Sequence, residues 1–192
     1  MVITIEIRKM YRYPFERVVD MHLNKYPTPL EQDVRGIKTV EEKRDHVSGI
    51  VYRKRIAVCN NVLPSILRKL TVMDVDDVFL EEESWLDLKQ KTMNIKSRCL
   101  TWTQFATLQE VSVFKESPAN PNWTEFFQKG SVTVTGVGRL NRLFELFAQS
   151  FFSKGVQKVR RDLELVSVWV NQACRVSTEK TWSGPESRTA QC

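Results

Sequence analysis

The sequence lacks the marks of a membrane-embedded or exported protein. No apolar run approaches the roughly 20 residues that a membrane-spanning helix requires. Residues Met1–Arg8 alternate between apolar and polar side chains. They have neither the continuous apolar core of a signal peptide nor the Arg- and Ser-rich composition of a transit helix. We therefore expect synthesis in the cytosol, with entry into any compartment by another route.

Cysteine and histidine are also scarce. The sequence holds 2 histidines, and its cysteines are widely separated, at Cys59, Cys99, Cys174 and Cys192. No pair has Cys-x-x-Cys spacing, so a zinc site is not expected and the thiols are interpreted as structural. The acidic run from Asp74 to Glu83 is interpreted as a solvated strand end, because same-side carboxylates of a strand lie about 7 Å apart. The sequence indicates no metal and no cofactor.

Signatures of catalysis are absent as well. There is no Gly-x-Ser-x-Gly elbow, His-Glu-x-x-His helix or Walker loop. Thr135–Gly138 supplies two glycines but not the third glycine of a dinucleotide-binding loop. His22 lies beside Val18, Val19 and Tyr26 on an apolar helix face, where it fits a core or pocket-wall histidine better than a general base. We expect a protein that is not an enzyme.

Positive charge is in excess, with a net charge of +6. This balance favours an acidic partner such as an anionic lipid, a nucleic acid or an acidic protein. Arg53 and Arg55 share one face of a predicted strand and are candidates to contact it. The aromatic residues mostly fall at inward positions, without the basic and aromatic clusters of RNA-binding modules. A nucleic acid is therefore not the expected partner.

Alternating apolar and polar residues predict about seven strands in consecutive order. They are Val2–Met10, Val34–Arg44, Ile50–Asn60, Leu70–Ser84, Thr92–Trp102, Leu108–Glu116 and Trp123–Thr135. Consecutive order favours an antiparallel meander over a parallel sheet. The turn His46–Gly49 is expected to close a hairpin with glycine at its tight position.

Two helices are predicted with these strands. The first is short and begins after Pro14, with apolar and aromatic residues at helical spacing up to Tyr26. The second runs from about Gly138 to Val170, and its two adjoining apolar stripes predict burial along much of its length. A curved sheet wrapped around this helix gives an α+β fold with room for an apolar pocket. We expect one domain over residues 1–170 and a polar, mobile tail over residues 171–192.

The segment Asn61–Leu70 breaks the strand pattern. Leu63, Ile66, Leu67 and Leu70 fall on one helical face, beside two basic residues. Two turns are too short for an independently stable helix. The segment is either a lid that touches a membrane or a connector with a few buried leucines.

An apolar stripe of the long predicted helix ends in lysines. Phe147, Phe151, Lys154 and Lys158 follow one another at spacings of four, three and four. Apolar wall followed by ammonium groups suits an anionic lipid, which needs hydrocarbon for its chains and positive charge for its phosphate. The alternative is a stripe that emerges into water with its lysines extended along the surface.

Seven short segments carry a family resemblance. In order they are Tyr13–Glu16, Lys25–Pro29, Arg53–Ile56, Leu63–Leu67, Glu82–Trp85, Ser97–Trp102 and Gly155. Together they resemble the PRELI domain family, which includes the slowmo and yeast Ups proteins, over about residues 1–170. The resemblance implies a fold related to START and phosphatidylinositol-transfer proteins. It also implies a carrier of phosphatidic acid or phosphatidylserine in the mitochondrial intermembrane space.

The resemblance also implies roles for individual residues. Asn61–Leu70 corresponds to a mobile lid, and Lys25, Lys154 and Lys158 to basic positions near the head group. His22, Phe147 and Phe151 are expected in the pocket wall. Several family members are held soluble by a small helical protein with twin Cys-x9-Cys motifs, so such a partner is expected, together with transient contact with a membrane surface.

Two hypotheses follow for the function. The first is non-enzymatic transfer of one anionic phospholipid at a time between membranes. The second is a membrane-associated interaction or regulatory protein whose pocket has lost its function. A phospholipid that co-purifies one-to-one with the protein would favour the first.

Overall fold

The computed structural model describes residues 2–24, 33–70 and 73–135, together with residues 142, 143, 146, 147 and 150. The chain divides into two units, Met1–Phe152 and Ser153–Cys192. Every described residue belongs to the first unit. The boundary predicted near residue 170 lies outside the described residues.

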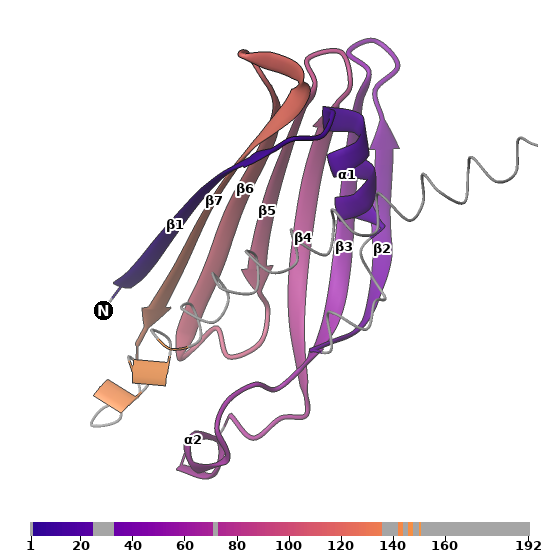
Figure 1. Ribbon diagram of the computed structural model, residues 1–192. Helices are drawn as coiled ribbons and strands as arrows, with labels where there is room; N and C mark the ends of the chain where they lie inside the picture. Colours follow the sequence, from indigo (N-terminus) through magenta and orange to yellow (C-terminus); the bar gives the residue numbers. More distant parts are fainter. Residues whose placement is uncertain are drawn as a thin grey trace, which may run out of the picture. The chain divides into compact units, whose positions relative to one another are not determined.

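Seven antiparallel strands of the described part form one curved sheet (Figure 1). They are β1 (Val2–Tyr11), β2 (Val34–Arg44), β3 (Ile50–Asn60), β4 (Asp77–Asp87), β5 (Thr92–Cys99), β6 (Ala106–Ser117) and β7 (Asn120–Val134). Their order in the sheet is β1-β7-β6-β5-β4-β3-β2. The predicted meander is therefore confirmed from β2 to β7, and β1 returns to pair with β7 along its full length.

The β2–β3 hairpin has the predicted bounds and the predicted turn. Asp45 shapes this turn, because one carboxylate oxygen accepts from the Val47 N–H at 2.9 Å and the other accepts from the Ser48 hydroxyl at 2.6 Å. Gly49 has φ of +82°, in the left-handed region that glycine enters without a Cβ clash. Local turn chemistry thus fixes the register of this hairpin.

A short helix, α1 (Phe15–Leu23), follows Pro14 as predicted. Proline suits this place because the start of a helix needs no bonded N–H. Phe15, Val18 and Val19 are at most 5% exposed, and α1 packs against β6 and β7. Figure 1 shows α1 in front of the sheet. We call the sheet face that α1 covers the helix-side face and the opposite face the outer face.

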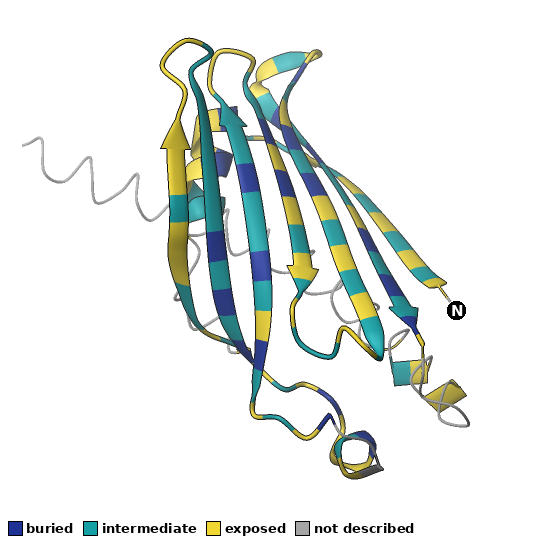
Figure 2. Cartoon of the chain, turned by 180° about the vertical axis from the view of Figure 1, so that it is seen from behind, coloured by how far each residue is buried: buried dark blue, intermediate teal, exposed yellow. Residues whose placement is uncertain are grey.

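One contact assigns the side chains of β1 and of β3 to β7 to a face. The ring of His22 lies 5.1 Å from the ring of Phe114, so Phe114 is on the helix-side face. Side chains alternate along a strand, and directly paired residues of neighbouring strands share a face. Figure 2 views the sheet from the outer side and shows residues of different burial alternating along several strands.

The segment between β3 and β4 contains a second short helix, α2 (Ser65–Leu70). The Asn61 side-chain amide closes this segment by donating to the carbonyl oxygens of Met73 at 3.0 Å and Val75 at 2.7 Å. These bonds hold residues 73–75 in the loop. The strand predicted from Leu70 therefore begins seven residues later, at Asp77, and that part of the prediction was wrong.

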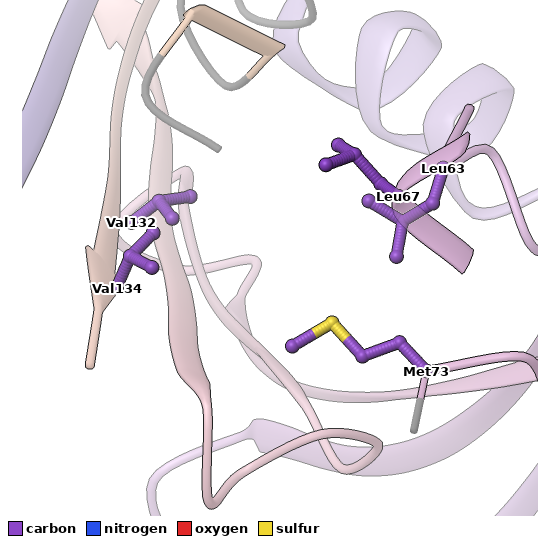
Figure 3. Packing of buried hydrophobic residues seen from close by; sticks show 5 residues of the cluster. All are labelled: Leu63, Leu67, Met73, Val132 and Val134. Atoms are coloured by element: carbon purple, nitrogen blue, oxygen red, sulfur yellow. The ribbon is translucent and has the colours of Figure 1, made fainter. Parts of the chain in front are cut away.

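The α2 segment is anchored to the far end of the sheet. A hydrophobic cluster joins Leu63 and Leu67 from this segment to Met73 and to Val132 and Val134 of β7. Figure 3 shows the two leucines pointing toward the two valines, with Met73 beside them. Leu67 is 1% exposed, whereas Ile66 is 60% exposed. Apolar burial at one helical face thus holds α2 against the sheet.

The acidic run from Asp74 to Glu83 was interpreted as a solvated strand end, but Glu81 is buried. Glu81 is 6% exposed on the outer face of β4. Its carboxylate lies 2.8 Å from Lys54 Nζ and 2.6 Å from Arg98 Nε. Neighbouring strands thus supply cations on both sides, which the sequence of β4 alone does not reveal.

The long predicted helix lies almost entirely outside the described residues. Positions 142, 143, 146, 147 and 150 are helical, and nothing further tests that prediction. Among the described residues, no helix is long and apolar enough to cross a membrane.

Replacing Leu67 by alanine tests the anchoring of α2. Leu67→Ala leaves a cavity in the cluster and is expected to lower the free energy of unfolding by about 2–5 kcal/mol. Ile66→Ala, on the exposed face of the same helix, is expected to change it by no more than about 0.5 kcal/mol. Urea denaturation measures both, and equal losses would contradict the packing described here.

Glu81 gives a pH-dependent prediction. Hydrogen bonds from Lys54 and then Arg98 lower the pKa of Glu81 from an ordinary value of 4.5. A lowered folded-state pKa stabilises the fold above about pH 4.5, and this contribution is lost as the pH falls through the folded value. Glu81→Gln should therefore lower the free energy of unfolding by about 1–3 kcal/mol at pH 7. Its effect should be smaller at pH 3 than at pH 7.

Glu6 supplies the control for this comparison. Its carboxylate pairs with Lys129 at 2.9 Å, but both side chains are about half exposed, at 47% and 52%. Glu6→Gln is expected to change stability little at either pH, because exposed ion pairs contribute little. Urea denaturation at the two pH values tests both variants. A loss of equal size at pH 7 and pH 3 for Glu81→Gln would reject the ion-pair explanation.

Candidate functional site

Polar side chains cross the middle of the helix-side face. Two adjacent rows of paired residues run across β3 to β7. We call their polar members the polar belt: Arg53, Arg55, Glu82, Ser84, Ser97, Glu110, Ser112 and Gln128. Arg55, Ser84 and Ser112 are at most 4% exposed. These three members of the belt are therefore buried, and the other members are partly buried.

An ion pair organises one end of the belt. Arg55 donates from Nε to Glu82 Oε1 at 2.9 Å, and its Nη2 also contacts that oxygen. Its Nη1 donates to the carbonyl oxygen of Leu23 at 3.1 Å. Leu23 is the last residue of α1, where helix carbonyls have no partner within the helix. Arg55 thus joins β3, β4 and the end of α1.

The other belt contacts also bond polar groups to one another. Arg53 Nε donates to Glu42 Oε2 at 2.9 Å. The Ser112 hydroxyl donates to Glu110 Oε1 at 3.2 Å. Both described arginines of the belt therefore have a carboxylate partner, and the belt combines positive, negative and neutral hydrogen-bonding groups.

Apolar rows flank the belt on both sides. Toward the β2–β3 hairpin lie Leu86, Met93, Phe114 and Phe126, with the rings of Phe114 and Phe126 4.7 Å apart. Toward α2 lie Ala57, Leu80, Leu108 and Val132. The helix-side face thus presents an apolar, a polar and again an apolar zone.

The zone near α2 contains a neutral thiol. Burial raises the pKa of the Cys99 thiol. The Cys99 Sγ also lies 3.1 Å from the carbonyl oxygen of Thr101, to which the thiol donates. Burial is the larger effect on the pKa and keeps the proton on sulfur, so Cys99 adds a small, uncharged side chain to this zone.

The outer face has a hollow of its own. It has a volume of about 590 Å³ and lies between β1, β7 and β6. The Arg8 guanidinium lies 5.0 Å from the centroid of the Phe127 ring, and Lys115 Nζ lies 2.9 Å from Glu125 Oε2. Because these residues alternate with helix-side residues, the thickness of the sheet separates this hollow from the polar belt.

The structure brings several of the predicted site residues together. Arg53 and Arg55 lie on the same face, as predicted, and both belong to the polar belt. His22 packs on Phe114 beside the belt, and Phe147 packs against the cluster of Leu63 and Leu67. The predicted pocket-wall residues His22 and Phe147 thus lie along the helix-side face.

Other predicted residues are not brought to a common place. Lys25, Phe151, Lys154 and Lys158 lie outside the described residues, as does the side chain of Leu70. Within the predicted lid, Leu63 and Leu67 are buried in the cluster and Ile66 is exposed. The lid and head-group roles of these residues stay predictions.

Most of the belt was missed in the sequence. Glu82, Ser84, Glu110 and Ser112 stand at strand positions that, in sequence alone, fit a solvated face. The usable signal is Arg55, because a charged residue at an inward position of a strand requires polar partners at the paired positions. Finding those partners requires the pairing register.

Three solved structures share the fold. TTHA0849 from Thermus thermophilus has a TM-score of 0.54 at 12% identity, covering 88% of this chain and 99% of that protein. The Zhui aromatase/cyclase from a Streptomyces species has a TM-score of 0.52 at 9% identity, with coverages of 85% and 94%. Ara h 8.0201 has a TM-score of 0.51 at 11% identity, with coverages of 88% and 99%.

Sequence relatives cover nearly the whole chain. The protein slowmo homolog of Dictyostelium discoideum is 24% identical over 188 residues, which is 96% of this chain and 81% of that protein. A UPS-like protein of Schizosaccharomyces pombe is 26% identical over 165 residues, or 85% and 88%. The model of the PRELI-like family matches residues 16–172. This match includes the polar belt, the α2 segment and all described strands except β1, and the chain belongs to the PRELI-like family.

Proposed function

We propose that this protein binds one phospholipid against the helix-side face of its sheet and carries it between membranes without changing it chemically. The observation that carries the proposal is the zoning of this face, where a polar belt with a buried Arg55–Glu82 ion pair separates two apolar zones. Membership of the PRELI-like family and the shared fold are consistent with lipid binding or transfer. The proposed setting is the mitochondrial intermembrane space.

The zoning suits a molecule with both hydrocarbon and polar parts. Acyl chains would replace water along the apolar rows, and each buried methylene group contributes about 0.8 kcal/mol. The belt would offer the side-chain amide of Gln128 to glycerol or head-group oxygens, and Ser84 and Ser112 could donate there by exchanging their present acceptors, the Arg53 carbonyl and Glu110. A ligand that was only apolar would cover this polar zone without hydrogen bonding to it, which is unfavourable.

The proposed cargo is an anionic phospholipid of the phosphatidic acid or phosphatidylserine class. Arg53 and Arg55 already neutralise Glu42 and Glu82, so the additional positive charge is assigned to Lys25, Lys154 and Lys158. Lys25 is two residues beyond Leu23 in the sequence, and the carbonyl of Leu23 contacts Arg55.

The outer-face hollow favours a second candidate function. Its apolar and charged lining suits a protein partner, which would make this chain an interaction or regulatory protein at a membrane. The same hollow is also compatible with the carrier, as a place for the proposed small helical partner with twin Cys-x9-Cys motifs. Lipid transfer by the purified protein separates the two functions.

The transfer assay uses donor liposomes that contain fluorescent phosphatidic acid or phosphatidylserine and unlabelled acceptor liposomes. The protein is expected to move at least one of these lipids, alone or with the helical partner. The double variant Lys154→Glu, Lys158→Glu should lose at least tenfold in rate, because it reverses charge at the proposed head-group site. Lys43→Glu, Lys129→Glu makes the same change in net charge on exposed strand residues and should retain transfer.

The two double variants separate the possible failures. No transfer by the wild type under any of these conditions would reject the carrier. Equal transfer rates in both double variants would reject the role of Lys154 and Lys158 while leaving the carrier in place.

A second experiment tests the polar belt. Arg55→Met combined with Glu82→Leu removes the buried ion pair at similar volume, and such replacements are often neutral or stabilising. The variant is expected to fold, as checked by urea denaturation, and to bind phospholipid at least tenfold more weakly, a loss of about 1.4 kcal/mol. Lys115→Met with Glu125→Leu makes the same kind of change at the outer hollow and should leave binding unchanged. The opposite pattern would place the ligand at the outer hollow instead.

A further inference from the structure

Trp102 has a backbone conformation that few bulky residues adopt. It lies in the connection between β5 and β6 with φ of +61°. This left-handed region is unfavourable for a side chain with a Cβ, and such residues persist where the surroundings hold them in place. The structure around Trp102 therefore holds this residue in its unusual backbone conformation.

Hydrogen bonds on both sides of Trp102 hold this conformation. The Trp102 carbonyl oxygen accepts from the N–H groups of Phe105 at 2.7 Å and Ala106 at 2.9 Å. The hydroxyl of Thr101 accepts from the Phe79 N–H at 2.9 Å. The connection is thus tied to β4 and to the start of β6, and the indole is directed to one place on the helix-side face.

The indole lies in apolar surroundings. It packs against the cluster of Leu63, Leu67, Met73, Val132 and Val134. It also packs against a second cluster, which consists of Ala57, Cys59 and Val78. Trp102 therefore joins the apolar zone near α2 to the ends of β3 and β4.

The indole N–H of Trp102 is a buried hydrogen-bond donor. Trp102 Nε1 has no hydrogen-bond partner among the residues that the structure describes. An indole N–H can only donate, and a buried donor without an acceptor is unfavourable. Phenylalanine would fill most of this apolar space without this penalty. The N–H thus has a use that packing does not explain.

We propose that the Trp102 indole N–H donates to a carbonyl oxygen of an acyl ester in the bound phospholipid. This inference rests on the proposed function. It makes Trp102 a ligand-binding residue that sets the depth at which the glycerol backbone lies between the polar belt and the zone near α2.

The chemistry of the surroundings selects a neutral acceptor. A phosphate oxygen placed among these aliphatic side chains would be a buried charge and would require a cation beside it. The two arginines of the polar belt, Arg53 and Arg55, are held by Glu42 and Glu82. A trapped water would find few of the two to four polar partners that buried waters usually have. An ester carbonyl is uncharged, accepts strongly and is joined to the hydrocarbon that the two clusters favour.

Two phosphatidic acids with identical chains test the proposal, one with ester and one with ether linkages. The ether lacks the carbonyl acceptor. In competition against a fluorescent phosphatidic acid, the wild-type chain should bind the diester about five- to tenfold more tightly, as expected for one hydrogen bond. Trp102→Phe should bind both lipids with affinities within about twofold of each other. Trp85→Phe makes the same substitution on the outer face and should keep the wild-type preference.

A preference for the diester that is unchanged in Trp102→Phe would overturn the inference and leave the carrier intact. Wild-type protein that binds neither lipid would reject the proposed function and the inference with it.

A second measurement uses the wild-type protein and does not depend on the folding of a variant. The assigned Trp102 indole N–H resonance should shift downfield and exchange more slowly with solvent in the diester complex than in the diether complex. Identical shifts and exchange rates in the two complexes would also overturn the inference.

Discussion

The contact of Arg55 with both Glu82 and the end of α1 is the interaction on which the helix-side face depends. It joins two neighbouring strands to a helix that is more than thirty residues earlier in the sequence. A guanidinium so deeply buried is stable only when its donors are satisfied, so α1 must end where its last carbonyl meets Arg55. This contact and the burial of Phe15, Val18 and Val19 together hold α1 against the sheet, and the contact of His22 with Phe114 follows from that position.

The same interaction explains why the helix-side face can be polar in its middle. Glu82 balances Arg55, and the neighbouring rows supply serine and glutamine side chains that are small or flexible enough to pack. The apolar rows then form two separate zones, one covered by α1 and one by the α2 segment. An uninterrupted hydrophobic core would have stabilised the sheet more simply, but it would have left no place for a ligand with a polar part.

Local patterns predicted the parts of the fold that local forces determine. The β2–β3 hairpin was predicted with its bounds because Asp45, Ser48 and Gly49 specify the turn within a few residues. The start of α1 after Pro14 was predicted for the same reason. The start of β4 was not, because Asn61 holds carbonyls that are twelve and fourteen residues away. The partners of Arg55 and the environment of Trp102 depend on strands distant in sequence, and periodicity within one strand carries no information about them.

The pairing of β1 with β7 has a consequence for how the chain reaches its folded state. Val2 is paired with Thr133, so the first strand has to wait for the last strand of the sheet before its backbone groups gain partners. Contacts this distant in sequence slow folding, because a long loop must close before they form. In a chain emerging from the ribosome, the first strand therefore stays unpaired until nearly the whole sheet has followed it. During this interval its free backbone groups are open to pairing with the wrong strand.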